Sequence, residues 1–231
     1  MTINIGVLGQ VLFNPRKAFE SIKEQTSMGD GILMYIILNV IGGIIGMVVT
    51  YAAWGGIVTP RGVALGMGNW AVSLIIGLII GVIMLITVAL LASKIAASIG
   101  KSKDSLDRTV GFLGYAEVVN LVMGILIAVV MVAIMGNAYS TALSGSVQGE
   151  AGVVIGSLAI IGMLGVLGFI WMLYVGGSAV AVANDVSLGA GIVSYFIAAL
   201  IVGLIVSVIV VAGLMTMGLT MLNSGYFPGV A

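Results

Sequence analysis

The residues best placed to do chemistry in this sequence are Glu117 and Asn120, which interrupt a long apolar run. A helix would place them on one face, with Gly124 and Ala128 following at helical spacing. A charge at the centre of a bilayer costs about 2.5–3.5 kcal/mol on insertion scales, and such residues commonly mark ion or proton pathways. Glu117 is therefore the first candidate for a functional site.

Lys94 is the natural partner of Glu117. It lies five residues before the end of the preceding apolar run, and a short charged hinge at residues 100–108 brings the two runs side by side. We therefore predict an intramembrane polar site of Glu117, Lys94 and Asn120, acting as a proton or ion contact or as a polar pivot. The alternative is a pair that only neutralises itself, or a Lys94 side chain that extends to the membrane interface.

Composition excludes most other chemistry. The chain has 231 residues, of which 61% are apolar and 7% charged, and it contains no cysteine and no histidine. Zinc sites of the Cys/His kind, haem ligation by His and histidine-dependent catalysis are excluded. A single carboxylate at depth does not make an aspartyl pair, and there is no Walker motif. We expect no enzyme, no metal and no cofactor, and the zero net charge argues against nucleic-acid binding.

Soluble proteins carry about 25% charged residues, so this chain must be embedded in a membrane. A span needs about 20 apolar residues. The predicted spans are residues 32–54, 70–99, 109–135, 153–183 and 191–222. The fold predicted is an all-α integral membrane protein, with an N-terminal cytoplasmic or interfacial segment at residues 1–31 and a five-span membrane domain at residues 32–231. Residues 55–69 and 136–152 are expected to be loops, and Gly176-Gly177 is the expected weak point of the fourth span.

Lysine and arginine counts predict the orientation. With the N-terminus in the cytoplasm, seven cationic residues fall on that side and only Arg61 falls on the other. The C-terminus is then outside. No cleaved signal peptide is recognised.

A short amphipathic helix is predicted before the first span. Asn14 and Pro15 form a favourable helix start. The cations Arg16, Lys17 and Lys23 are expected to contact anionic lipid headgroups, in the manner of an interfacial helix. The alternative is an exposed connecting helix.

Two further features are given mainly structural roles. Asn184 and Asp185 should form the turn between the fourth and fifth spans, capping or ending helices at the cytoplasmic surface. The GxxxG pairs in the first two spans are weak signals for a homo-oligomer, and packing within one chain is the favoured interpretation.

Three stretches together resemble the YIP family, integral membrane proteins named for interaction with Ypt/Rab GTPases. They are LFNPRKAFESIKE at residues 12–24, VGFLGYAEVVNLV at residues 110–122 and FIWMLYVGGSAVAVANDVSLGAGIVSYF at residues 169–196. The residues that carry the likeness are Pro15, Phe19, Gly114, Tyr115 and Trp171. Val118 and Val119 stand where family members often have a proline. About 31 residues precede the first span, which is typical of bacterial or archaeal members rather than of eukaryotic ones.

The resemblance implies five spans with the N-terminus inside, in a prokaryotic plasma membrane. The favoured function is a non-enzymatic scaffold or membrane-organising, trafficking-like factor, with the bilayer and a protein at the cytoplasmic face as partners. The alternative is a small transporter or channel that uses Glu117, Lys94 and Asn120. A third hypothesis is a subunit that needs another membrane protein.

Overall fold

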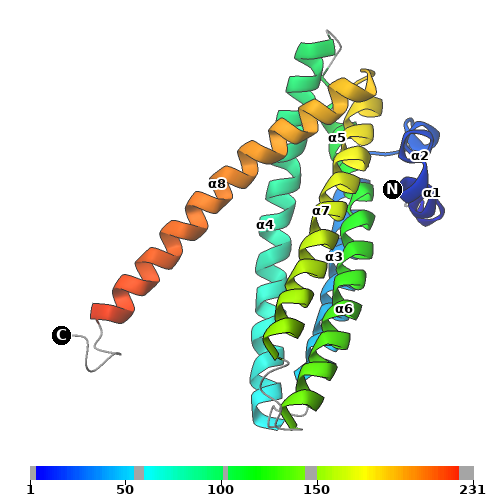
Figure 1. The fold of residues 1–231 in the computed structure, drawn as a ribbon. Coiled ribbons are helices and arrows are strands. Elements are labelled where there is room, and N and C mark those ends of the chain that lie inside the picture. The colour runs from blue at the N-terminus through cyan, green and yellow to red at the C-terminus, as the bar shows by residue number, and fades with distance from the viewer. Residues whose placement is uncertain (1–3, 55–59, 101–103, 144–149, 224–231) are drawn as a thin grey trace.

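The structure is a computed structural model, and it describes residues 4–54, 60–100, 104–143 and 150–223. Within these ranges the chain forms helices joined by short turns, without strands (Figure 1). A short segment comes first, formed by η1 (Ile5–Val7), α1 (Leu8–Phe13) and α2 (Pro15–Ile22). It lies beside one end of a bundle of long helices.

Five stretches of the described chain are long and apolar enough to cross a membrane, which confirms the predicted fold class. They lie in α3 (Met28–Trp54), α4 (Pro60–Gly100), the pair α5 (Leu106–Ala116) and α6 (Val118–Leu143), α7 (Glu150–Ala183) and α8 (Leu188–Asn223). The spanning parts are Met28–Val49, Trp70–Gly100, Leu106–Ala133, Ala159–Ala183 and Leu188–Ala212.

Several helices are longer than the sequence indicated. Residues 60–69 were expected in a loop, but α4 begins at Pro60. That expectation was wrong because proline is well suited to the first helical position, where its missing N–H needs no partner. Similarly, α6 continues to Leu143 and α7 already begins at Glu150, so the expected loop at residues 136–152 is largely helical.

The third span is divided at Glu117. Its α5 part ends at Ala116 and α6 begins at Val118, with Glu117 in a turn at φ −58° and ψ −15°. The Leu121 N–H donates to the Glu117 carbonyl at 3.1 Å, so the helix resumes directly after the turn. Irregular backbone within a membrane is tolerated where it is buried or lines a cavity. The sequence predicted one uninterrupted helix here.

Buried side chains gather in one half of the bundle, which we call the packed half. It includes all of α5, residues 30–38 of α3, 85–96 of α4, 118–123 of α6, 175–183 of α7 with the following Asn184, and 191–202 of α8. In the remainder of the long helices, which we call the open half, no described side chain is buried. The bundle therefore has a protein-like core over only part of its length.

Glycines allow the close helix contacts of the packed half. A Cβ on Gly114 would overlap the backbone of Gly31, so α3 and α5 touch backbone to backbone at this point. Gly176 faces the ring of Tyr195, and Gly177 faces Ile192, where α7 meets α8. The expected weak point at Gly176-Gly177 is therefore a helix contact, and α7 continues through it.

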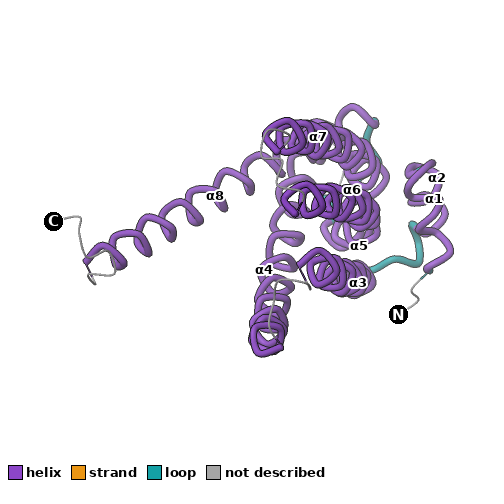
Figure 2. The backbone as a smooth tube through the Cα atoms, turned by 60° about the horizontal axis from the view of Figure 1, so that its bottom comes forward, coloured by secondary structure: helices purple, strands orange, loops and turns teal. Residues whose placement is uncertain are grey.

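Helix α8 diverges from the other helices. Figures 1 and 2 show it leaving the bundle diagonally from its N-terminal end. Between residues 203 and 212 every side chain is exposed or partly exposed, on all faces of the helix. This is the surface expected of a helix surrounded by lipid.

Candidate functional site

Glu117 and Asn120 lie together at the border between the packed and open halves. The Asn120 Nδ2 donates a hydrogen bond of 2.8 Å to Glu117 Oε2. Glu117 is partly buried, whereas Asn120 is exposed on the surface of α6. Glu117 follows Leu106 by eleven residues, about 16 Å along a helix, which places it near the middle of a ~30 Å hydrocarbon layer.

Lys94 does not join this site. Its side chain is exposed on α4, and the structure contains no ion pair between Lys94 and Glu117. The predicted pairing is therefore absent. The neighbouring Ser93 points the other way and is fully buried. Within the described residues, Glu117 has its hydrogen bond to Asn120 and no cationic partner.

Cavities reach Glu117 from two sides. One of about 360 Å³ lies between α3, α4 and α6, and its polar lining residues are Asn39, Ser73, Glu117 and Asn120. A second, of about 160 Å³, is lined by Glu117 and the two tyrosines Tyr35 and Tyr195. The divided helix therefore lines a cavity on each side of its break.

Asn184 is the centre of a different polar cluster, at the end of the bundle where α4, α5 and α7 meet. Its Oδ1 accepts from Ser93 Oγ at 2.8 Å and from the Ser105 N–H at 3.0 Å. Its Nδ2 donates to Thr109 Oγ1 and to the Val180 carbonyl, both at 3.0 Å. Ser93 also bonds Asp104. We call Ser93, Asp104, Ser105, Thr109 and Asn184 the hinge network.

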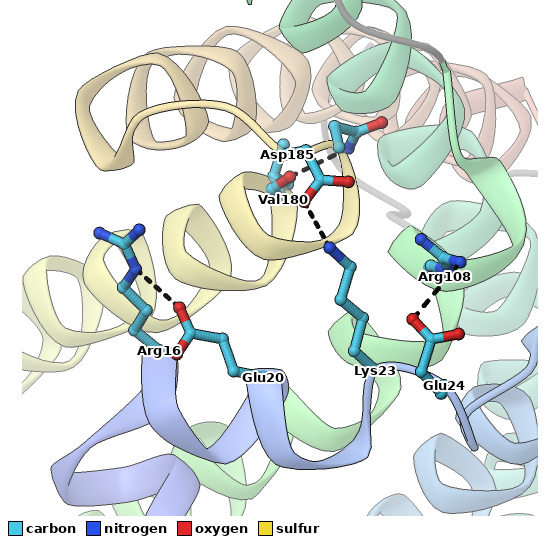
Figure 3. Close-up of polar contacts among 8 residues, drawn as sticks. Arg16, Glu20, Lys23, Glu24, Arg108, Val180 and Asp185 are labelled. Carbon is cyan, nitrogen blue, oxygen red and sulfur yellow. Dashed lines mark hydrogen bonds and ion pairs between the residues drawn. The ribbon is translucent and has the colours of Figure 1, made fainter.

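Asp185 follows Asn184 in a left-handed conformation, with φ 53°. The Val186 N–H bonds the Ala181 carbonyl at 3.0 Å, which closes the C-terminus of α7 in a Schellman-type cap. The Asp185 carboxylate pairs with Lys23 from the end of α2 (Figure 3). Nearby, Arg108 approaches Glu24 at 3.9 Å.

The apolar face of α2 is covered by protein. Pro15, Ala18, Phe19 and Ile22 are buried, and the Phe19 ring stacks on Phe112 of α5 with centroids 5.1 Å apart. Of the three cations expected to contact headgroups, Lys23 pairs with Asp185 and Arg16 with Glu20. Lys17 is exposed and forms no ion pair in the described chain. Headgroup contact stays a prediction.

Four of the five residues that carry the family likeness lie where the N-terminal segment docks on the bundle, and the fifth, Gly114, lies between α3 and α5. Pro15 begins α2 and Phe19 is its buried anchor. Tyr115 is buried and its hydroxyl accepts from the Asn4 N–H at 3.1 Å, while the Trp171 Nε1 donates to the Leu12 carbonyl at 3.0 Å. Gly114 lets α3 approach α5. These positions are explained by packing.

Sequence reasoning found Glu117 and Asn120 but missed the residues around them. Asn39 and Ser73 belong to other spans, and nothing in their spacing links them to Glu117. The central role of Asn184 was also missed. An amide beside a turn is the signal that could have indicated it, because a side chain with two donors and an oxygen acceptor can join several elements.

Comparison with known protein families identifies the family of this chain. The Yip1 domain model matches residues 9–211, which covers α1 through most of α8. The search of curated proteins and the search of solved structures each give no significant match. Since the matched region spans most of the chain, including the docked N-terminal segment, this protein belongs to the Yip1 family.

Proposed function

We propose that the chain is a non-enzymatic, multi-pass scaffold of a prokaryotic plasma membrane, which organises the membrane through a protein partner at its cytoplasmic face. The observation that carries the proposal is the docking of α2. Its buried face fixes the helix against α5 and α7, so its charged residues are presented in a defined geometry. We call the exposed residues Arg16, Lys17, Glu20 and Glu24 the charged platform.

The proposal places the charged platform and the hinge network in the cytoplasm, as the distribution of Lys and Arg predicts. Because the chain has no cysteine, single-cysteine variants can test this directly. A Lys17→Cys variant should react with a membrane-impermeant thiol reagent only after the membrane is opened. Labelling of Lys17→Cys in intact cells would overturn the orientation.

A photoreactive amino acid at Lys17, in cells, tests for the partner. The expected result is one discrete protein adduct that charge reversal at Glu20 abolishes, and no such adduct from the same group at Ile79, which is exposed on α4 in the open half. Adducts with lipid alone at Lys17, unaffected by Glu20→Lys, would contradict the scaffold function.

A second function is favoured by a specific observation, the cavities that reach Glu117 from two sides of a divided span. Transporters commonly build their sites from discontinuous helices near the middle of the membrane. A small transporter or channel would use Glu117 and Asn120, with Lys94 outside the site. Flux into proteoliposomes should be lower with Glu117→Gln than with the wild type, and it should be unchanged with Glu20→Gln. Equal flux with the wild type and both variants would refute this function.

A further inference from the structure

The cavity between α3, α4 and α6 has the features of a ligand site. Its volume of about 360 Å³ lies in the usual range for small-molecule pockets, ~300–1,000 Å³. Polar groups on Asn39, Ser73, Glu117 and Asn120 line it together with four leucines. Such pockets typically combine apolar walls with a few polar groups that orient the ligand.

One glycine on the wall of this cavity faces open space. A Cβ on Gly77 would meet no atom within 4 Å, whereas a Cβ on Gly43 would come within 2.9 Å of the Leu74 side chain. There is therefore room for a larger side chain at residue 77 without a clash. In the packed half the same residue type brings helices together, as Gly114 does with Gly31.

The charge of Glu117 indicates what the cavity would accept. Its Oε2 accepts one hydrogen bond from a neutral amide, and the described residues that line the cavity include no lysine or arginine. An uncompensated carboxylate at membrane depth is costly, and a cationic ligand would offset that cost. The same carboxylate would disfavour a ligand whose only charged group is an anion.

The shape of the cavity favours an organic cation over a metal ion. Hard cations such as Ca²⁺ and Mg²⁺ need about 6–8 oxygen ligands at ~2.0–2.6 Å, held closely around the ion. Here four polar residues are spread over a roomy cavity that is otherwise apolar. An ammonium group has N–H donors for the Glu117 carboxylate and the amide oxygens, and its hydrocarbon chain would contact Leu38, Leu74 and Leu121.

We propose that this cavity binds the ammonium group of an amphiphilic amine, with Glu117 as the charged acceptor and the leucine walls holding the hydrocarbon chain. The amine is either the headgroup of a membrane lipid or a free amphiphile. This inference deepens the second function, and it does not require that the ligand be transported.

The test is calorimetric titration of the full chain in detergent with octylammonium, octanol and octanoate. Octylammonium should bind at least about tenfold more tightly than octanol, and Glu117→Gln should remove that preference. Asp107→Asn is the control, since it neutralises an exposed carboxylate outside the cavity. Equal affinity for octylammonium and octanol, or an unchanged preference in Glu117→Gln, would overturn the proposal.

A second variant keeps the proposal testable if Glu117→Gln does not fold. Gly77→Leu should fill the cavity and abolish octylammonium binding, whereas Gly165→Leu, at an exposed glycine with open space around it, should leave binding intact. Binding that persists in Gly77→Leu would place the ligand elsewhere and overturn the proposal.

Native mass spectrometry distinguishes a lipid headgroup from a free amphiphile as the source of the ammonium group. If the ligand is a lipid headgroup, phosphatidylethanolamine but not phosphatidylcholine should stay bound to the wild type and be lost from Glu117→Gln. If the ligand is a free amine, neither lipid is retained and octylammonium still binds. Retention of both lipids equally by both proteins would contradict a site selective for a primary ammonium. Binding without flux would refute only the transport function.

Discussion

The packed and open halves of the bundle use the same residue types for different purposes. In the packed half, Gly31 and Gly114 bring two backbones into contact, and the amide of Asn184 is buried with all its hydrogen-bonding groups satisfied. At the border of the open half, Gly77 faces empty space and the amide of Asn120 is exposed. The difference indicates that the packed half provides the stability of the fold, while the open half has room for lipid or ligand.

The largest expected effect comes from adding a methyl group at the glycine that lies tightest against another helix backbone. Gly114→Ala should lower the free energy of unfolding by about 3 kcal/mol, because α3 and α5 must separate to accommodate it. Thermal unfolding of the full chain in detergent measures this. Gly165→Ala, where the new Cβ meets no atom within 4 Å, is the control and should be nearly neutral. Equal losses in the two variants would remove the distinction between the halves.

Removing the centre of the hinge network should cost somewhat less. Asn184→Ala removes four hydrogen bonds, each worth about 0.5–1.5 kcal/mol, although Ser93, the Ser105 N–H and Thr109 each keep another partner. Water that enters at this end of the bundle can replace some of these hydrogen bonds. We therefore expect Asn184→Ala to lower the free energy of unfolding by about 2 kcal/mol.

The matched control for Asn184→Ala is Ser207→Ala on α8, because the Ser207 hydroxyl bonds only the Gly203 carbonyl of its own helix. If Asn184→Ala unfolds at the same temperature as Ser207→Ala, the hinge network does not hold the packed half together.

The smallest effect is expected for the ion pair between α2 and the α7–α8 turn. Asp185 has a side-chain exposure of 68% and Lys23 of 22%, so solvent screens much of their attraction. Exposed pairs are worth about 0–1 kcal/mol. Asp185→Asn keeps a residue that tolerates the left-handed conformation, and it should shift the unfolding midpoint by less than about 3 °C.

Docking of α2 should instead depend on its buried ring. Phe19→Ala removes the stacking on Phe112 and should expose α2 to proteolysis before the rest of the chain. If the protease cleaves α2 at the same rate in the wild type and in Phe19→Ala, the ring does not fix the helix.

The five spans could be predicted from the sequence, because a run of about 20 consecutive apolar residues is typical of a membrane-spanning helix. It was also sufficient for the start of α2 at Pro15, although the Asn14 side chain makes no capping hydrogen bond. The break at Glu117 could not be predicted, since Ala116 and Val118 on either side are compatible with a continuous helix.

The site could be predicted only in part. Glu117 is conspicuous as a charge in an apolar run, and Asn120 follows from helical spacing. The contribution of Asn39 and Ser73 depends on how α3 and α4 pack against α6, which no local pattern encodes. Lys94 was assigned to the wrong neighbour because the rotation of α4 about its axis, which turns Ser93 inward and Lys94 outward, cannot be derived from hinge length.

If Glu117 serves a ligand, as proposed above, its carboxylate should not be needed to hold the helices together. Thermal unfolding of Glu117→Gln beside Gly114→Ala tests this most directly. We predict that Glu117→Gln unfolds no more than about 2 °C below the wild type, because the hydrogen bond from Asn120, the one that Glu117 makes within the described residues, can still form and the costly charge is removed. A loss of stability as large as that of Gly114→Ala would show that the carboxylate is structural, and would contradict the account.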